Sequence, residues 1–472
     1  MITIKSAIVA IALSALAASA QQLPHLRVSD NQHFLVTESG KPFFYMADTG
    51  WELFHRLDRE QAIQYLDTRA SQKFNVIQAV ALAEIDGITV PNAYGKLPLV
   101  GQDPAKPDLS KGSYWEHVDF IVDQANKRGI YIAMLPTWAS WVNRDEHNRR
   151  IFTPEDAQVY GEFLGRRFGS KGVIWILGGD RPATGYEQVW RALARGIAIG
   201  VAGKEDYSSV LMSFHPPGTQ SSSTWFHSDP WLDFNMQQDG HNPPAQSRSW
   251  DKIAADYART PTKPVIDGEP LYEDHPLAFR ASELGYSFDA HVRQYVYSDT
   301  FAGACGVTYG NHAVWQMYAP GRGPINGPLM YWFQAIHRPG ANQMQFLRAL
   351  LESRPYLSRV PDQSLVVNAL EGADHITATR GDGYLFVYSA QGRKFTLRLA
   401  KNSGDNISGD KISGDKLKAW WFNPRSGSSL EAGLFDNRGE LTFVPPSQGF
   451  GSDWVLVLDD VSKNFPGPGK SR

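Results

Sequence analysis

Short apolar runs alternate with segments of helical periodicity between about Phe43 and Ala319. Short apolar runs of this kind are typical of buried strands, and apolar residues at helical spacing are typical of helices that cover a sheet. The alternation predicts repeated βα units, and eight of them predict a closed (β/α)8 TIM barrel of the α/β class. The eight runs are Phe43–Asp48, Val76–Glu84, Tyr131–Trp138, Val173–Asp180, Val210–His215, Phe234–Asp239, Val265–Glu269 and Gly306–Trp315.

The segments between the runs contain helix starts and apolar stripes. Thr153-Pro154-Glu155-Asp156 places an N-cap residue, a proline and two acids in the order that favours the start of a helix. We expect a last long helix at about Leu329–Glu352, whereas the connection Pro216–Pro230 lacks a clear helix and predicts a degenerate unit. The clearest apolar stripe consists of Tyr114, Val118, Ile121, Val122 and Ala125.

The periodicity changes after Arg354-Pro355, where alternating strands separated by Gly, Asp and Asn turns replace the βα pattern. This pattern is typical of antiparallel sheets and predicts a C-terminal β-sandwich domain. A Ser-Gly-Asp triplet repeats at a period of five from Ser403 to Asp415. We expect a mobile hairpin loop there, with calcium binding as the alternative. The main predicted strands begin at His375, Tyr384, Phe395, Leu417 and Trp454.

The N-terminal residues have the pattern of a signal peptide. Lys5 precedes an apolar run from Ala7 to Ala18, and Ala18-Ser19-Ala20 is a small-residue cleavage pattern. We therefore expect an exported protein, periplasmic or extracellular, and no later stretch predicts a membrane span. The predicted organisation is a signal peptide at 1–20, a (β/α)8 barrel at 27–355, a β-sandwich at 360–461 and a disordered tail at 462–472.

Composition and net charge limit the classes of ligand that the protein is expected to bind. The formal net charge of -3 provides no basic surface for nucleic acid. The single cysteine, Cys305, excludes intramolecular disulfides and lies in an apolar run, so we expect it to be a small core residue. Aromatic residues make up 12% of the chain, with fourteen Trp. Because flat aromatic faces suit the apolar C–H faces of sugar rings, this richness is compatible with a carbohydrate ligand.

Two acids stand out among the residues that end the predicted strands, where barrel enzymes carry their chemistry. Asp180 and Glu269 each follow an apolar strand through glycine, and we expect the missing side chains to leave room for a ligand. If they end the fourth and seventh strands, they face each other. Cleavage of a glycosidic bond needs such a pair, because one acid protonates the leaving oxygen while the other attacks the anomeric carbon or activates water. The alternative is that they cap helices or pair with cations, as Asp180 with Arg181.

The other strand-end residues are candidates for binding a substrate. The tryptophans are either sugar platforms or core residues, the histidines donate hydrogen bonds or orient neighbours, and the remaining acids bind sugar hydroxyls or support residues that do. The sequence contains no metal-ligand, phosphate-loop or nucleophile-elbow motif, so we predict neither a metal nor a cofactor. The candidates are Asp48, Trp51, Glu84, Trp138, Trp141, His215, Gln238, Tyr309, His312 and Trp315.

Six motifs along the chain form a recognisable set. They are Phe44-Tyr-Met-Ala-Asp-Thr-Gly-Trp-Glu-Leu-Phe54, Phe74-Asn-Val-Ile-Gln, Trp175-Ile-Leu-Gly-Gly-Asp180, Asp267-Gly-Glu-Pro270, Gly310-Asn-His312 with Trp315, and Trp421-Phe-Asn-Pro-Arg425. Together they resemble the apiosidase-like glycoside hydrolases, in which the barrel is followed by a β-domain labelled as the collagen-binding domain of a collagenase. The resemblance extends from about Leu26 to Asp459.

The resemblance implies an exo-apiosidase that releases apiose from rhamnogalacturonan II with retention, using Asp180 as acid/base and Glu269 as nucleophile. The larger clan of retaining barrel glycosidases has Asn-Glu where this chain has Gly179-Asp180. That departure suits an unusual sugar such as a branched furanose. Two alternatives for the function remain open. One is another polysaccharide glycosidase of the arabinofuranosidase or β-glucanase type, and the other is a non-catalytic carbohydrate- or matrix-binding protein.

Overall fold

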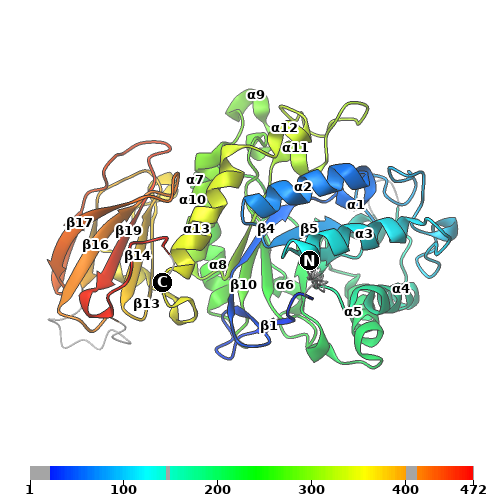
Figure 1. Cartoon of the computed structure of the whole chain (residues 1–472), viewed down its shortest axis with the longest axis horizontal. Coiled ribbons are helices and arrows are strands. Elements are labelled where there is room, and N and C mark those ends of the chain that lie inside the picture. Colours follow the sequence, from blue (N-terminus) through cyan, green and yellow to red (C-terminus); the bar gives the residue numbers. More distant parts are fainter. Residues whose placement is uncertain (1–21, 145–148, 400–411, 471–472) are drawn as a thin grey trace, which may run out of the picture.

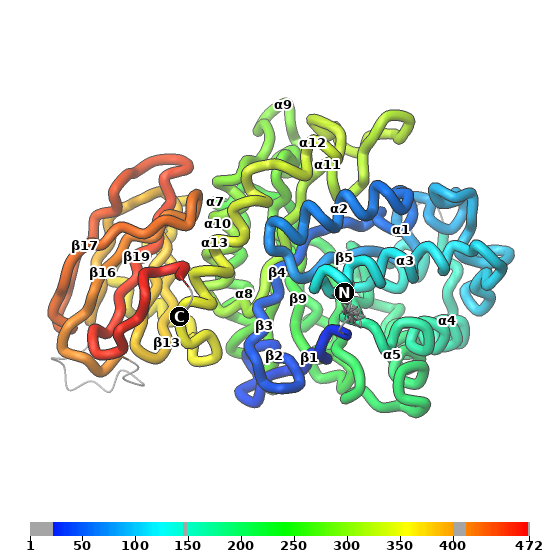
Figure 2. The backbone as a smooth tube through the Cα atoms, viewed as in Figure 1, coloured from blue at the N-terminus to red at the C-terminus, as the bar shows by residue number. Residues whose placement is uncertain are grey.

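The computed structural model describes residues 22–144, 149–399 and 412–470. A barrel and a β-domain lie side by side, with α10 (Asp289–Ala302) and α13 (Pro339–Glu352) between them (Figure 1). Figure 2 shows that the chain completes the barrel before it enters the β-domain. The predicted signal peptide lies outside the described residues. Within the described ranges, no helix is both long enough and apolar enough to cross a bilayer.

Eight parallel strands form the barrel, as the alternation of apolar runs predicts. Their order is β8-β7-β6-β5-β4-β11-β10-β9, so β8 and β9 meet at the seam. At the seam, the Asp233 N–H donates to the Met212 carbonyl at 2.9 Å, and the Ser213 hydroxyl donates to the Phe234 carbonyl at 2.7 Å. The strands are β4 (Tyr45–Thr49), β5 (Val76–Val80), β6 (Tyr131–Leu135), β7 (Val173–Gly178), β8 (Met212–His215), β9 (Asn235–Gln238), β10 (Val265–Glu269) and β11 (Gly306–Tyr309).

The helices around the barrel begin where capping signals predict. In α4 (Pro154–Phe168), the Thr153 hydroxyl accepts from the Asp156 N–H at 3.2 Å, and Pro154 occupies the first turn. The apolar stripe predicted for α3 (Tyr114–Lys127) is buried throughout. Other helices are α1 (Leu53–Arg56), α2 (Arg59–Ser71), α5 (Glu187–Ala202), α7 (Pro244–Ser247), α8 (Ser249–Tyr257), α9 (Ala281–Leu284) and α11 (His312–Trp315).

Two irregularities concern the predicted helices. The connection between β8 and β9 holds only the single turn α6 (Ser223–Phe226), in agreement with a degenerate unit. The single helix expected at about Leu329–Glu352 is wrong, because that segment forms α12 (Trp332–Ala335) and then α13. Pro339 begins the second helix since proline lacks the N–H that would continue the first, and the residue before it is extended.

The β-domain consists of a six-stranded sheet and a two-stranded sheet, both antiparallel, as expected for a β-sandwich. In β14, side chains alternate between two cores. Phe386 and Tyr388 pack toward the barrel, whereas Leu385 and Val387 pack into the interior of the domain. The strands are β12 (Val360–Pro361), β13 (Ile376–Gly381), β14 (Tyr384–Ser389), β15 (Phe395–Leu399), β16 (Lys416–Phe422), β17 (Ser429–Asp436), β18 (Gly439–Phe443) and β19 (Trp454–Asp460). Before the barrel, β1 (Leu26–Val28), β2 (Leu35–Thr37) and β3 (Pro42–Phe43) form a small antiparallel sheet.

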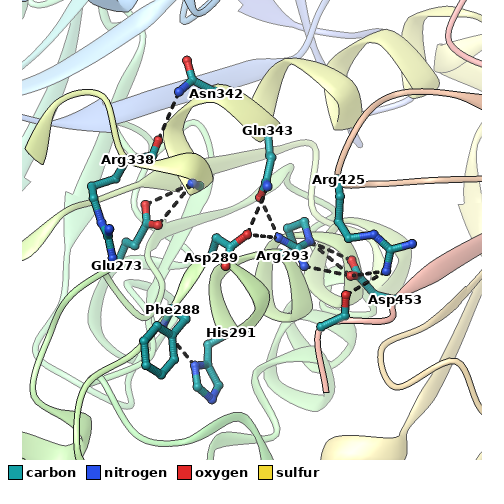
Figure 3. Close-up of polar contacts among 12 residues, drawn as sticks. Glu273, Phe288, Asp289, His291, Arg293, Arg338, Asn342, Gln343, Arg425 and Asp453 are labelled. Carbon is teal, nitrogen blue, oxygen red and sulfur yellow. Dashed lines mark hydrogen bonds and ion pairs between the residues drawn. The ribbon is translucent and has the colours of Figure 1, made fainter. Parts of the chain in front are cut away.

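Aromatic stacking and a buried ion-pair network hold the two domains together. Figure 3 shows the polar contacts of this network around Arg293. Tyr297 of α10 stacks on Tyr388 of β14, with ring centres 5.1 Å apart. Arg293 of α10 donates to Asp453 at 2.9 Å and to Asp289 at 2.6 Å. Removal of one partner would leave an uncompensated buried charge, so this network fixes how the β-domain sits on the barrel.

Residues 462–470, where we expected disorder, pack against the domain junction. The Arg354 guanidinium donates to the Pro466 carbonyl at 3.0 Å and lies over the Phe465 ring at 4.7 Å. Of the Ser-Gly-Asp repeat, the first two copies lie outside the described residues. In the third copy the Gly414 N–H donates to Asp460 at 2.8 Å. The single Cys305 is buried beside β10, as expected of a core residue.

Candidate active site

Asp180 follows β7 on a strained turn. Gly178, Gly179 and Asp180 have φ of 95°, 124° and 55°, and the last value is unfavourable for a non-glycine residue. A Cβ on Gly179 would lie 2.6 Å from Trp138, and one on Gly178 would lie 2.4 Å from the His215 carbonyl oxygen. The expectation that these glycines leave room for a ligand is therefore wrong. They let β7 approach Trp138 and β8 closely, and this packing holds Asp180 in place.

Glu269 reaches the mouth of the barrel through a bulge in β10. Asp267 pairs with Gln237 and Glu269 with Gln238, so Gly268 has no counterpart on β9. An extra residue shifts the alternation of side chains, and Asp267 and Glu269 consequently face opposite sides of the strand. A Cβ on Gly268 would lie 2.5 Å from Met236, which explains the need for glycine at this position.

The two acids lie close together with two histidines beside them. A carboxylate oxygen of Asp180, one of Glu269 and a ring nitrogen of His215 all lie within 4.8 Å of one another. His241 Nε2 donates to Glu269 Oε1 at 3.0 Å, and His215 Nε2 lies 3.0 Å from Glu269 Oε2. Gln238 Nε2 donates to Asp180 Oδ1 at 2.7 Å. Two carboxyl groups at this distance suit a catalytic pair, and the same three side chains could also bind a metal ion.

The surroundings push the pKa values of the two acids apart. Burial raises the pKa of Asp180 to about 6, and the charge of Glu269 adds to this effect. Burial alone would also raise the pKa of Glu269, but the contacts with His215 and His241 outweigh it and hold that pKa below its ordinary value. Glu84, on the loop after β5, has its pKa raised to about 8 by burial and by the charges of Asp180 and Glu52. Near neutral pH one partner can therefore hold a proton while the other is ionised.

Several buried polar atoms near the pair have no hydrogen-bond partner among the described residues. They include Trp138 Nε1, Gln238 Oε1, His241 Nδ1, His215 Nδ1 and the Tyr272 hydroxyl. Buried polar groups are satisfied in the great majority of cases, because an unpaired donor or acceptor costs about 1–3 kcal/mol. The hydroxyl groups of a sugar are both donors and acceptors, so a bound sugar would satisfy atoms of this kind.

Trp51, Trp138, His215 and Gln238 gather around the pair, as the strand-end rule predicts. The Trp51 ring centre lies 5.3 Å from that of Trp138 and 5.4 Å from that of His215. Trp51 and Trp138 are only 2% and 1% exposed, however. Neither offers a broad face to a sugar, so we interpret them as side chains that hold His215 in position.

Asp48 and Tyr309, predicted as substrate-binding residues, are turned toward the helix layer and make their hydrogen bonds there. Asp48 is fully buried, is paired with Arg69 of α2 at 2.7 Å, and accepts from the Tyr65 hydroxyl. Tyr309 is also buried, and its hydroxyl donates to Glu273 at 2.6 Å. Both side chains already have protein partners, so they stabilise the packing of α2 and α13 on the barrel.

Trp141, His312 and Trp315 have hydrogen bonds or ring contacts with residues other than the pair. The Trp141 N–H donates to the Ala83 carbonyl at 3.1 Å, and Arg149 covers its ring at 5.1 Å. The Trp315 N–H donates to His312 Nδ1 at 3.3 Å. These three side chains therefore have protein partners and do not contact Asp180 or Glu269 among the described contacts.

Three residues near the pair escape the strand-end rule. His241 follows β9 by three residues, with φ of 54°, and donates to Glu269. Tyr272 lies 4.5 Å from His241 between ring centres, and Phe279 lies 5.7 Å from it. All three stand on loops beyond the last residues of β9 and β10. A search that extended three to ten residues past each strand would have included them.

A second carboxylate group lies on the other side of β10. Oxygens of Asp239, Asp267 and Asp299 lie within 4.8 Å of one another, and all three side chains are buried. Burial and the mutual repulsion of the carboxylates raise the pKa of Asp267 well above its ordinary value. The Lys252 ammonium lies 4.0 Å from Asp239. This group faces the helices α8 and α10, away from Glu269.

A cavity of about 530 Å³ lies at the opposite end of the barrel. Its lining includes Arg27, Tyr131, Lys171 and Trp175, and none of the predicted site residues. Barrel enzymes place their chemistry at the C-terminal ends of the strands. We therefore assign the site to the mouth of the barrel, where Asp180 and Glu269 lie.

A comparison with models of known families identifies the family of this chain. A family model described as "Apiosidase-like, catalytic domain" matches residues 29–358. The chain belongs to the apiosidase-like family. A second model, "Putative collagen-binding domain of a collagenase", matches residues 360–459 of this apiosidase-like protein.

Two solved structures are similar over nearly the whole apiosidase-like chain. A crystal structure of a glycoside hydrolase family 5 protein from Bacteroides vulgatus ATCC 8482 has 34% identity and a TM-score of 0.84, with 95% of each chain covered. Another, named "Glycoside hydrolase", has 35% identity and a TM-score of 0.84, covering 95% of this chain and 99% of that one. No curated protein matches. The apiosidase-like protein is thus a glycoside hydrolase that acts on carbohydrate.

Proposed function

We propose that this protein is an exported, exo-acting glycosidase that releases apiose from rhamnogalacturonan II with retention of configuration. The observation that carries the reaction type is the close pair Asp180 and Glu269, whose pKa values are shifted in opposite directions. Retaining enzymes place their carboxyl groups about 5–5.5 Å apart, and inverting enzymes need about 6.5–9.5 Å to admit a water. Oxygens within 4.8 Å favour retention.

In the first step, Glu269 attacks the anomeric carbon while Asp180 protonates the leaving oxygen. The bond between the anomeric carbon and that oxygen breaks, and an ester forms between the sugar and Glu269. His215 and His241 hold Glu269 as an anion in attacking position. Gln238 orients the Asp180 carboxyl through its 2.7 Å hydrogen bond.

In the second step, Asp180 acts as a general base, because it lost its proton in the first step. It takes a proton from water, the water oxygen attacks the anomeric carbon, and the ester to Glu269 breaks. Both carboxyl groups return to their starting protonation states. Because each step inverts the anomeric centre, the released sugar has the configuration of the substrate.

The choice of apiose follows from family membership and from the residue before the acid. Retaining barrel glycosidases usually carry an asparagine there, and this chain has Gly179, whose missing side chain Trp138 replaces in space. An amide cannot bind the sugar's 2-hydroxyl from this position. That difference supports an unusual sugar ring, and apiose is a branched furanose.

A digest of a glycan panel tests the proposal. The purified protein should release apiose from rhamnogalacturonan II, and proton NMR during turnover should show the retained anomer first. Arabinan and mixed-linkage β-glucan serve as the alternative substrates. Release of arabinose or glucose oligomers instead would replace the substrate assignment but keep the reaction type. Binding to a glycan without release of any sugar would identify a binding protein.

A further inference from the structure

Phe279 is an exposed aromatic residue that lies next to a residue of the catalytic site. Its side chain is 57% exposed, although it follows β10 by only ten residues. Its ring centre lies 5.7 Å from His241 and 4.8 Å from His275, and it is nearly perpendicular to both rings. His241 in turn donates to Glu269. Only one side chain therefore separates Phe279 from Glu269.

The backbone that presents Phe279 is strained. Ala278 and Phe279 have φ of 51° and 61°, in the left-handed region that residues with a side chain rarely occupy. The Ala278 N–H donates to the His241 carbonyl at 2.9 Å, which ties this turn to the loop after β9. Strained residues concentrate at functional sites, and Asp180 and His241 have left-handed φ as well.

The ring contacts fix the orientation of Phe279. His241 and His275 stack on each other with ring centres 4.0 Å apart, and Phe279 meets both in edge contacts. Edge contacts of this kind are favourable between aromatic rings. An aromatic ring that is held in one orientation beside a catalytic residue offers its free face to a ligand with an apolar face.

The other aromatic side chains near the site are less suitable. Trp51, Trp138 and Trp141 are almost completely buried. Among the described residues, only Phe279 of the exposed large aromatics has a ring contact with His241. The others in this exposed set are Tyr94, Phe288, Phe333 and Phe450.

We infer that Phe279 is a platform for the sugar residue from which the terminal sugar is cleaved. This assignment rests on the exo-acting mechanism proposed above. The terminal sugar must reach Glu269, which is only 3% exposed, and the rest of the oligosaccharide must then extend toward solvent. Phe279 is exposed and only one side chain away from Glu269, so its ring can provide the apolar surface on which the C–H face of that next sugar stacks.

Three variants and two substrates test this platform. Phe279→Ala should lower kcat/KM on oligosaccharides of rhamnogalacturonan II by about five- to tenfold, mainly through a higher KM. On apiofuranosyl fluoride, whose leaving group is a single atom that cannot stack on the ring, kcat/KM should change less than about twofold. Phe279→Trp should keep oligosaccharide turnover close to that of the wild-type protein. Phe279→Leu should lose turnover as Phe279→Ala does, because leucine is apolar but not flat.

Phe450→Ala is the matched control. Phe450 is 58% exposed and contacts His291, away from the catalytic pair. Its replacement should leave both substrates unaffected. An equal loss on both substrates for Phe279→Ala, or no loss on oligosaccharides in a variant with unchanged Tm, would overturn the platform.

A binding assay separates failure of the platform from failure of the proposed function. Glu269→Gln and the double variant Glu269→Gln/Phe279→Ala are titrated with oligosaccharides of rhamnogalacturonan II, arabinan and β-glucan. If the wild-type protein cleaves none of the three, the proposed function fails. Weaker binding by the double variant of any of them would then still support the platform. Equal binding by the two variants, or binding by neither, would overturn it.

Discussion

Two groups of carboxylates lie on opposite sides of strand β10. Toward the mouth of the barrel, oxygens of Asp180 and Glu269 lie within 4.8 Å of each other, and toward the helices those of Asp239, Asp267 and Asp299 also lie within 4.8 Å of one another. The single residue Gly268 separates the two groups along the chain. Residue type and spacing are therefore alike, so neither one distinguishes a catalytic pair from a structural cluster.

The partners of each group make the difference. Glu269 has two histidines that stabilise its anion, and Gln238 orients Asp180. In the other group, Ser249 donates to Asp299 at 2.6 Å, and Lys252 is only at 4.0 Å from Asp239. Hydrogen-bond donors lower the pKa of one carboxyl group while the pKa of its neighbour is raised. One group can then be the proton donor and the other the nucleophile. Carboxyl groups whose pKa values all rise are prepared to remain protonated.

The largest expected effect comes from Glu269→Gln. Glutamine keeps the shape of the side chain but cannot form the glycosyl-enzyme ester, so kcat should fall by about 10⁴- to 10⁶-fold on every substrate. Initial-rate measurements on rhamnogalacturonan II and on an aryl apioside would check this. Substantial activity of the variant on either substrate would mean that Glu269 is not the nucleophile.

Asp180→Asn should have a smaller effect that depends on the leaving group. Loss of the general acid should cost about 10²- to 10⁴-fold on the polysaccharide, whose leaving sugar must be protonated. An aryl glycoside departs without protonation and should be affected much less. Added azide should accelerate turnover of the aryl substrate by Asp180→Asn and not by Glu269→Gln, because the first variant still forms the intermediate. The reverse rescue pattern would exchange the two roles.

The pH profile of kcat/KM should sharpen the same contrast. The pKa of Asp180 is about 6, so activity should fall above this pH by roughly tenfold per unit as the acid loses its proton. The pKa of Glu269 lies below its ordinary value, so activity should persist on the acidic side. The fall above pH 6 should be absent in Asp180→Asn with an aryl substrate. If activity instead falls near pH 8, and this fall is absent in Glu84→Gln, then Glu84 rather than Asp180 supplies the catalytic proton.

The sequence predicts the barrel and part of the site because both depend on local patterns. Apolar runs specify the strands, and position at a strand end identifies Asp180, His215, Gln238 and Glu269. Position does not specify which way a strand-end side chain points. Asp48 ends β4 in the same way, yet it pairs with Arg69 of α2. That pairing depends on how helix and strand pack, which no local pattern encodes.

Other features escape prediction for related reasons. The bulge at Gly268 is defined by the register against β9, and so it requires a partner strand to be recognised. His241 lies in a loop whose left-handed backbone turns it back toward Glu269. Strand β17 is half exposed and carries no clear apolar alternation, so the sequence pattern does not predict it.

The smallest effect on activity is expected for Asp267→Asn, on the other side of β10. Asparagine matches the neutral carboxyl group in shape and can still donate a hydrogen bond to Asp239 or Asp299, so kcat should change less than about threefold. The effect should lie in stability and its dependence on pH. The folded-state pKa values of Asp239 and Asp267 are raised above the ordinary 3.8, that of Asp239 to about 6. Their stabilisation is complete below pH 3.8 and is lost as the pH rises through the folded-state values.

Asp267→Asn removes one of these titrating groups, so the Tm of the variant relative to wild type should rise as the pH increases from about 3.8 through the raised folded-state values. Thermal unfolding across this range measures the difference, with the exposed Asp382→Asn as a control whose relative Tm should stay flat. A variant that loses activity as Glu269→Gln does would show that the helix-side group takes part in catalysis. A wild-type Tm that rises with added Ca²⁺, when that of Asp267→Asn does not, would mean that a cation rather than shared protons neutralises the three acids. In either case the three acids on the helix side of β10 would form a second functional site, and the contrast between a catalytic pair and a structural cluster would be wrong.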